Sequence, residues 1–268
     1  MTPYDRAHAA MTAEPENDAL RLAVYDRLAD AELFLLLEDE VEGQDIRPQV
    51  FEAEDGAFVL AFDTEERMAD FCDGPMPYAA LPGRIIAQNL VGENIGLGIN
   101  LGVAPSAMLL PPEALDWLSE TLTHSPSHIT GRPVSFEAPA LPPAILGLLL
   151  PAFEAKFDQL IGAATHALLG GVTYEDGHKG HVLALLGTPE SARPAIAKAM
   201  GEALTFSGLD AGELDVTFLD EDSEAAQRLL AKALVLHLPE HEHEEAPAAP
   251  QEKPKGPGMD PSKPPILR

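Results

Sequence analysis

The glycine-rich stretch GLGINLGVAP, residues 96–105, carries the spacing in this sequence that most resembles a chemical motif. Its glycines approach the G-x-G-x-x-G pattern that holds a dinucleotide pyrophosphate at the start of a helix. Here the third glycine comes one residue late, and prolines at 105, 111 and 112 prevent the helix that the motif requires. The alternation of Leu97, Ile99 and Leu101 predicts instead a strand with one apolar face and no bound cofactor.

Two groups of histidines have spacings that suit metal ligation. HLPEHEHEE supplies His237, His241 and His243, but a proline at 239 interrupts the helix that would bring their rings together. EDGHKGH supplies His178 and His181 at the tip of a predicted hairpin. We expect both groups to be solvated and to form no metal site, with a weak site in the first group as the alternative.

The single cysteine and the many carboxylates give no catalytic set. Cys72 excludes an internal disulfide, fits a reducing compartment, and is read as a small buried residue, because the acids beside it in DFCDGP raise a thiol pKa. LDEDSE (219–224) lacks the glycine and final glutamate of a calcium loop, so it is read as a strand end leading into a helix. No G-x-S-x-G or G-x-x-x-x-G-K-[ST] motif is present.

Arg84 and Asn100 are the two candidate binding residues. Arg84 is one of only six basic residues among the first 130, and it precedes an apolar run, while Asn100 ends the glycine-rich strand. The alternative roles are a local salt bridge for Arg84 and a turn-closing side chain for Asn100.

The elements that would position these residues begin after a polar start. Residues 1–17 predict a flexible arm. Residues 18–125 then predict a first α+β domain, with the clearest hairpin signal at Asp55-Gly56. Its elements are a helix over 17–32, a strand over 32–38, two strands over 48–62, helices over 63–72 and 82–90, strands over 96–101 and 106–110, and a helix from 112.

The second part of the chain shows a different order of elements. Residues 131–238 predict strand, helix, two strands joined at Asp176-Gly177, helix, strand and helix, which is a ferredoxin-like order with an added helix. Residues 239–268 contain 8 of the 25 prolines and few apolar residues, so we expect a disordered tail.

The charge is strongly acidic, with 44 acidic against 17 basic residues and a formal net charge of −27. Most of this excess lies in residues 1–130, which hold 24 acidic residues. Such a surface repels nucleic-acid phosphates and anionic lipid headgroups, so we exclude both as partners. It serves solubility or, alternatively, attracts a basic partner protein.

The sequence shows no targeting or membrane-spanning segment. The first 18 residues contain acids and no apolar core of a signal peptide, and the longest apolar runs are far shorter than the ~20 residues of a spanning helix. We therefore expect a soluble, cytoplasmic protein.

Two segments resemble the SseB family, bacterial proteins named for enhanced serine sensitivity. FDTEERMADF is similar to the family's Phe-Thr-x-x-x-x-x-x-x-Phe segment, and IGLGINLG is similar to its Gly-x-x-x-Asn-Pro-Gly segment. Leu101 stands where the family commonly has proline, which leaves the turn after Asn100 less constrained. The likeness covers about residues 18–122, and the order of elements over 131–238 resembles the family's C-terminal domain.

The resemblance implies no catalytic residues and no cofactor, and it implies a link to serine sensitivity only through the family's name. We predict a non-enzymatic cytoplasmic interaction or assembly module with an unidentified protein partner. The alternative is an amino-acid or other small-molecule sensor, or an enzyme, with a site between the domains near Arg84 and Asn100. A pocket of convergent polar groups favours the alternative, and an exposed apolar patch or acidic face favours the module.

Overall fold

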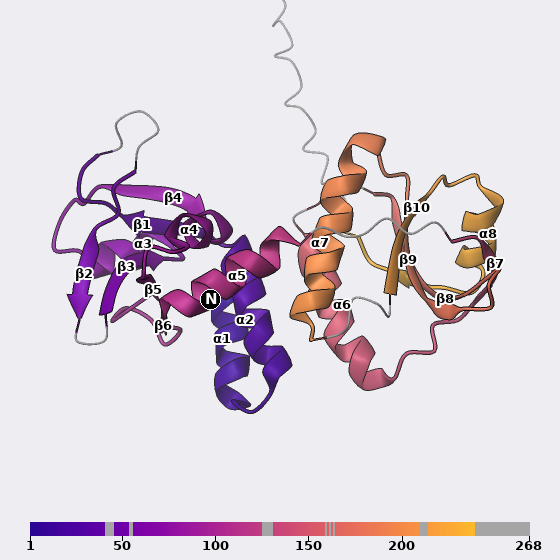
Figure 1. The fold of residues 1–268 in the computed structure, drawn as a ribbon, viewed down its shortest axis with the longest axis horizontal. Helices are drawn as coiled ribbons and strands as arrows, with labels where there is room; N and C mark the ends of the chain where they lie inside the picture. Colours follow the sequence, from indigo (N-terminus) through magenta and orange to yellow (C-terminus); the bar gives the residue numbers. More distant parts are fainter. Residues whose placement is uncertain are drawn as a thin grey trace, which may run out of the picture.

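The chain folds into two halves, residues 1–124 and 131–238, each built on its own sheet with helices packed against it (Figure 1). This arrangement confirms the predicted α+β class. The computed structural model describes residues 1–40, 46–53, 56–124, 131–158, 160, 162, 164–208 and 214–238. The predicted tail, residues 239–268, lies outside these ranges.

The N-terminal half begins with two helices, and its strands and remaining helices follow in mixed order. They are α1 (Pro3–Ala13), α2 (Asp18–Asp30), β1 (Glu32–Leu36), β2 (Val50–Ala53), β3 (Gly56–Phe62), α3 (Glu65–Phe71), β4 (Tyr78–Pro82), α4 (Gly83–Leu90), β5 (Ile95–Ile99), β6 (Met108–Leu110) and α5 (Pro112–Thr123). The strands run in the order β4-β1-β3-β5-β6, with β2 also paired to β3. The strand β4 was not predicted, and it completes one edge of the sheet beside β1.

The two faces of this sheet are covered to different extents. On one face Leu33, Val59 and Leu97 belong to a core that also includes residues of α2, α4 and α5. On the other face Leu36, Leu60 and Phe62 form a smaller core with Met68 of α3. The second face is therefore the thinner layer of the N-terminal half.

The glycine-rich segment is sheet backbone, as predicted, but the strand is shorter than expected. β5 ends at Ile99, and Leu101, predicted on the same apolar face as Leu97 and Ile99, lies in the following turn and packs against the smaller core instead. β5 pairs in parallel with β3 and antiparallel with β6. A Cβ at Gly96 would lie 2.5 Å from the ring of Phe58, and a Cβ at Gly98 would lie 2.6 Å from the side chain of Leu101. Glycine is needed here because neighbouring side chains occupy the space over the strand.

The prediction of a flexible arm over residues 1–17 is wrong, because α1 occupies most of it. Thr2 and Asp5 form a reciprocal capping box, in which each side chain accepts a hydrogen bond from the other's backbone N–H. Tyr4 is 1% exposed, and Ala7 and Met11 pack against the same core. The spacing 4, 7, 11 is that of one helical face, and it anchors the segment.

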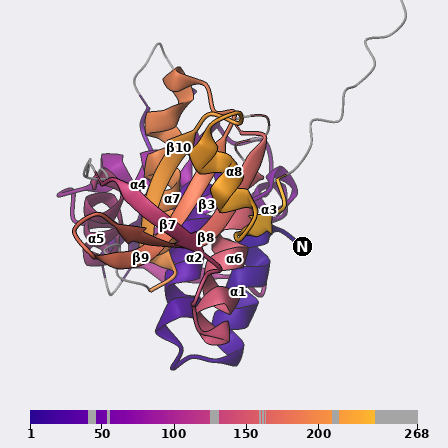
Figure 2. The same ribbon diagram turned by 90° about the vertical axis from the view of Figure 1, so that its right-hand side faces the viewer.

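The C-terminal half contains a second sheet between two layers of helices. Its elements are β7 (Pro133–Glu137), α6 (Pro143–Phe157), β8 (His166–Tyr174), β9 (Lys179–Leu186), a 3-10 turn (Glu190–Ala192), α7 (Arg193–Phe206), β10 (Leu214–Leu219), α8 (Glu224–Leu230) and β11 (Leu234–Leu236). Figure 2 views this half from its outer side, with α8 in front of the sheet and α6 and α7 behind it. The strand β11 was not predicted.

The predicted order of elements is found, but the predicted ferredoxin-like pairing is not. The strand order is β10-β9-β8-β11, with β7 also paired to β8. β9 and β10, joined through α7, are direct parallel neighbours, whereas β7 and β8, joined through α6, are direct antiparallel neighbours. A split β-α-β arrangement requires a strand inserted between such pairs. Order along the chain does not fix which strands become neighbours.

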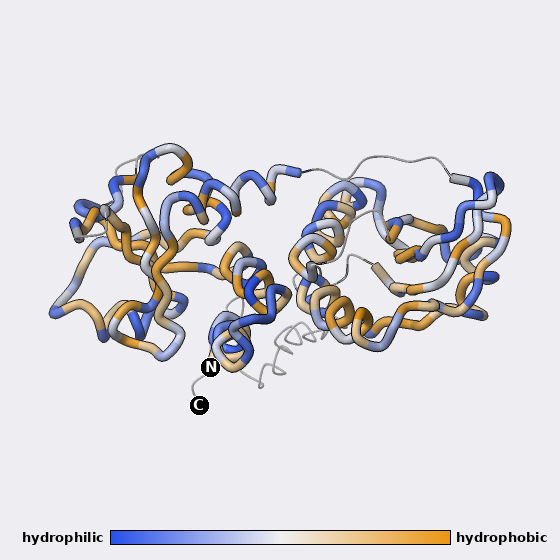
Figure 3. The backbone as a smooth tube through the Cα atoms, turned by 60° about the horizontal axis from the view of Figure 1, so that its bottom comes forward, coloured by the Kyte–Doolittle hydropathy of each residue, from blue (hydrophilic) through white to orange (hydrophobic). Residues whose placement is uncertain are grey.

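Hydropathy follows this layering, with hydrophobic residues concentrated along the strands of both halves (Figure 3). Within the described ranges, no helix of the protein combines the length and apolar character needed to cross a bilayer.

Candidate functional site

The two halves meet through helices that carry both apolar and charged side chains. Phe206 of α7 belongs to the core of the N-terminal half, with its ring 6.2 Å from that of Trp117 on α5. Trp117 also makes an edge-on contact with Tyr25 of α2, at 5.2 Å. These aromatic contacts link α2 and α5 of the N-terminal half to α7 of the C-terminal half.

Five charged residues at this contact form what we call the charge cluster: Asp26 and Asp30 of α2, Arg84 of α4, Lys156 of α6 and Glu202 of α7. Three of the four helices that carry the cluster, α2, α7 and α6, lie side by side in the middle of the molecule in Figure 1. The side chains of its acids and of Lys156 are at most 5% exposed.

Lys156 is the centre of the cluster. Its Nζ lies 2.7 Å from Asp26 Oδ1, 2.5 Å from Asp30 Oδ2 and 3.5 Å from Glu202 Oε2. The buried face of α6 places it there, because Leu149, Phe153 and Lys156 share one side of the helix. One lysine thus links α6 to carboxylates from both halves.

Arg84 bridges the halves at the edge of the cluster. Its guanidinium donates to both carboxylate oxygens of Glu202, at 3.2 and 3.1 Å, and also to Asp30. Gly83 makes this position accessible, since a Cβ there would lie 1.9 Å from the carbonyl oxygen of Leu28 on α2. The salt bridge expected as the alternative role of Arg84 is present, but it reaches across 118 residues.

Burial and charge act on the pKa values of the cluster in opposite directions. Burial raises the pKa of Asp26 despite the nearby Lys156. For Asp30, burial also favours the neutral form, but Lys156 and Arg84 outweigh it and lower the pKa. Burial opposes the charged form of Lys156, and its carboxylate neighbours overcome this and raise its pKa. Two aspartates one helical turn apart are therefore shifted to opposite sides of the ordinary value.

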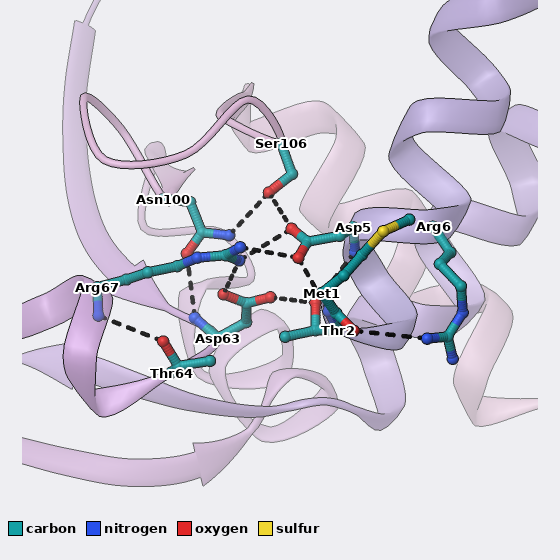
Figure 4. Close-up of polar contacts among 9 residues, drawn as sticks. All are labelled: Met1, Thr2, Asp5, Arg6, Asp63, Thr64, Arg67, Asn100 and Ser106. Atoms are coloured by element: carbon teal, nitrogen blue, oxygen red, sulfur yellow. Dashed lines mark hydrogen bonds and ion pairs between the residues drawn. The ribbon is translucent and has the colours of Figure 1, made fainter.

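Asn100 lies in a separate set of contacts, which we call the Arg67 network: Thr2, Asp5, Asp63, Arg67, Asn100 and Ser106 (Figure 4). Asn100 is fully buried, with φ of +52°, a conformation that asparagine tolerates better than most residues. Its side-chain oxygen accepts from the backbone N–H of Asp63 at 3.1 Å, and its Nδ2 donates to Ser106 Oγ at 3.2 Å. It holds the turn after β5, which was its alternative predicted role.

Arg67 and Asp5 form the strongest contact in this network. Nη1 and Nη2 of Arg67 donate to the two oxygens of Asp5 at 2.9 and 2.7 Å, and Nη1 also donates to Asp63 at 2.6 Å. Thr2 Oγ1 donates to Asp63, and Ser106 Oγ donates to Asp5, each at 2.6 Å. Hydrogen bonding to Arg67 holds the pKa of Asp5 well below its usual range. The network fixes α1 against the ends of β3 and β5.

The two predicted binding residues therefore lie in different places and are occupied by intramolecular partners. A cavity of about 210 Å³ lies beside the start of α1, lined by Thr2, Pro3, Tyr4, Arg27, Ala31, Glu32, Phe34 and Asp63. Neither Arg84 nor Asn100 lines it. The volume is below the ~300 Å³ at which ligand pockets usually begin.

An apolar and acidic surface lies on the thinly covered face of the first sheet. We call it the α3 face: Phe34, Phe71, Met76 and Tyr78, with Glu65, Glu66, Asp70 and Asp73 beside them. Phe71, Met76 and Tyr78 are 38–39% exposed, and the four acids are exposed. Phe34 and Tyr78 lie 5.7 Å apart, and the Tyr78 hydroxyl donates to Glu65 at 2.9 Å, so strands and α3 form one surface.

The remaining candidates from the sequence are the single cysteine and the histidines. Cys72 is half-buried, and burial together with Asp73 raises its thiol pKa. His178 is exposed and stacks on Tyr174, His181 is half-buried, and His237 is exposed. His241 and His243 lie outside the described residues. Across the part of the chain that the structure describes, no group of three or more histidine, cysteine or acidic side chains has the arrangement of a metal site.

Sequence reasoning missed Lys156, Asp26 and Glu202, although a signal was present. Each is a charged residue that falls, by helical periodicity, on the same face as the buried apolar residues of its helix. Such residues are rarely buried without a partner, so three of them indicate a shared ion cluster.

Comparison with known proteins identifies part of the chain. Residues 6–117 match the family model described as the SseB protein N-terminal domain. Searches of curated proteins and of solved structures give no match.

Proposed function

Since residues 6–117 make the N-terminal half of this chain a member of the SseB N-terminal domain family, we propose that the chain is a non-enzymatic, SseB-type interaction module for a basic partner protein. We extend the SseB assignment to the C-terminal half as part of the same proposal, on the order of its elements. The α3 face is the proposed binding surface.

The carrying observation is the combination of exposed apolar and acidic side chains on the α3 face. Three large apolar side chains more than one-third exposed and four exposed carboxylates occur within residues 65–78, which run from α3 into β4, and Tyr78 donates to Glu65 across this segment. Exposed apolar groups rimmed by charge are typical of protein-binding surfaces. The acids would steer a positively charged segment toward the face, and the aromatic groups would hold its apolar side chains.

The contacts of the two candidate binding residues, Arg84 and Asn100, support the same proposal. Arg84 is engaged by Asp30 and Glu202, and both ends of the Asn100 amide are hydrogen-bonded within the protein. Neither residue is free to recognise a substrate without breaking a buried contact, which would cost about 1–3 kcal/mol per unsatisfied group. These residues are more useful as structural connections than as catalytic groups.

The test uses peptides of defined chemistry. We would titrate the isotopically labelled protein with lysine-rich peptides that carry two leucine or phenylalanine anchors, and with polylysine that carries none. NMR shifts should map to α3, β1 and β4, with the anchored peptides binding at least about tenfold more tightly. Affinity should fall with added salt, because exposed charges are screened.

A pair of charge reversals separates this face from general acidity. Asp70→Lys lies on the α3 face, and Glu120→Lys lies on the exposed side of α5. Asp70→Lys should weaken binding several-fold, whereas Glu120→Lys should change it by less than about twofold. Equal effects of the two variants would contradict a specific face.

A small-molecule or amino-acid sensor is the competing proposal, and the cavity beside α1 is what favours it. Arg27, Glu32 and Asp63 give it both signs of charge, which suits a zwitterion. Serine itself is the first compound to test, since a link to serine sensitivity comes with the family's name. A single amino acid that raises the unfolding temperature in a saturable manner would favour the sensor over the interaction module.

A further inference from the structure

The charge cluster holds an excess of negative charge in a buried place. It contains three carboxylates and two cations, so its formal net charge is −1 when every group is ionised. An uncompensated charge in a poorly solvated site costs several kcal/mol, and a titratable group commonly becomes neutral instead. One carboxylate of the cluster is therefore a candidate to carry a proton.

The contacts identify which carboxylate is the extra one. Both oxygens of Glu202 accept from Arg84, and Asp30 accepts from Arg84 and from Lys156. Of the two cations, Asp26 contacts Lys156 alone, with Nζ 2.7 Å from its Oδ1. Asp30 and Glu202 each contact both cations, which leaves Asp26 as the least stabilised anion.

We propose that the charge cluster binds one proton on Asp26, and that the two halves are joined most firmly in this charge-neutral, proton-bound state. The groups that face Asp26 come from every helix around it: Asp30 and Arg27 on α2, Lys156 on α6, and, one contact further away, Arg84 on α4 and Glu202 on α7. The raised pKa of Asp26, caused first by burial, is consistent with this assignment.

The direction of the pH effect follows from the two aspartates. Because the pKa of Asp26 is raised in the folded protein, folding takes up a proton at pH values above the ordinary aspartate pKa of about 3.9. Stability from this group therefore increases as the pH falls from neutral toward that value. Asp30 acts in the opposite sense, because its lowered pKa gives stability that is lost as the pH falls below about 4.

Under this proposal the strength of the contact between the two halves depends on pH. When Asp26 ionises at higher pH, Lys156 must share its charge among three carboxylates, and the contact between α2 and α6 weakens. The halves are then held mainly by Arg84 and by the aromatic contact of Phe206 with Trp117. Mild acidification restores the neutral cluster.

The test compares the full chain with its Asp26→Asn variant, in which a neutral side chain of the same shape replaces the aspartate. Trp117 is the single tryptophan of the sequence and lies at the contact of the halves, so its fluorescence reports urea unfolding. As the pH falls from 8 toward the ordinary aspartate pKa of about 3.9, the folding constant of the unchanged protein should rise relative to the variant, by up to tenfold per pH unit for one proton. At pH 8 the variant should be at least as stable as the unchanged protein.

Two results would overturn the proposal: an Asp26→Asn protein that is less stable at pH 8, or one with the same pH dependence as the unchanged protein. Asp30→Asn is the matched comparison one turn away, and it should be less stable over the same pH range. If Asp30→Asn does not fold, infrared spectroscopy decides: as the pH rises above the ordinary aspartate value, the carbonyl band of a protonated carboxyl group should persist to a higher pH in the unchanged protein than in Asp26→Asn.

Discussion

The Arg67 network and the charge cluster each pair aspartates with an arginine, yet the pKa of an aspartate is lowered in the first and raised in the second. The Arg67 network has two aspartates and one arginine, so it too has a formal charge of −1. In that network the pKa of Asp5 is lowered, mainly through its hydrogen bonds with Arg67. In the charge cluster burial raises the pKa of Asp26.

The difference lies in burial and in the number of contacts with a cation. Both oxygens of Asp5 accept from Arg67, and the hydroxyl of Ser106 and the backbone N–H of Thr2 also donate to Asp5. In the charge cluster Asp26 has one cation beside it, Lys156 at 2.7 Å, and the effect of burial outweighs that contact. The comparison indicates that a carboxylate stays ionised where its hydrogen bonds and ion pairs outweigh the loss of solvation.

The largest expected effect is that of Lys156→Met, which leaves three carboxylates around Arg84 alone. Removing one partner of a buried ion pair costs about 3–5 kcal/mol, and we expect a loss of that size in the free energy of unfolding measured in urea. Lys179→Met on the exposed hairpin is the control and should change stability little. A loss below about 1 kcal/mol for Lys156→Met would show that the cluster is not an energetic connection between the halves.

A smaller effect is expected for Arg67→Met, because the network is partly solvated. The change removes the paired contact with Asp5 and the contact with Asp63, and hydrogen bonds to charged groups contribute about 1.5–3 kcal/mol. Hydrogen exchange should show faster exchange of the α1 amides than of the α5 amides. Unchanged protection of α1 would mean that Tyr4 and its apolar neighbours suffice to hold it.

Ser106→Ala should have a still smaller effect, about 1 kcal/mol, since it removes one neutral donor from Asp5. Its pH dependence is the informative part. The lowered pKa of Asp5 gives stability that is present above about pH 4 and is lost as the pH falls further. The variant should lose less stability on acidification than the unchanged protein does, whereas Ser119→Ala, a buried serine outside the network, should follow the unchanged protein.

Arg21→Ala should give the smallest change in unfolding free energy of the four variants. Arg21 and Asp18 are 2.7 Å apart, but their side chains are 49% and 76% exposed. Solvent screening should keep the change in unfolding free energy below about 0.5 kcal/mol. A loss comparable to that of Arg67→Met would remove the distinction between solvated and buried pairs on which the comparison depends.

Local features of the fold could be predicted from the sequence, and long-range ones could not. The glycine strand was predictable because alternation and proline placement are local properties, and the structure confirms it as β5. Helix α1 was missed because its signal is a capping box and three apolar residues in a polar stretch. Those apolar residues stabilise the helix only by packing against a core that is formed by distant parts of the chain. The strand pairing of the C-terminal half was mispredicted because neighbours in a sheet are set by packing, which order along the chain does not specify.

The candidate residues show the same limit. Arg84 was singled out for its rarity in an acidic region, and its ion-pair role was among the alternatives, but no local pattern could name Glu202 as its partner. Asn100 was identified at the end of its strand, and the burial of its amide beside Ser106 was outside the reach of sequence spacing. The α3 face, similarly, becomes visible only when β1, α3 and β4 are placed side by side.

The most direct test of the account is an NMR titration of the aspartate carboxyl carbons, with Asp5 and Asp26 followed in one sample. The account predicts that Asp26 titrates above the ordinary aspartate value of about 3.9 and Asp5 below it, although each belongs to a group with the same formal charge. If both residues titrate on the same side of that value, the contrast between the two regions, and with it the proton-bound cluster between the halves, would be contradicted.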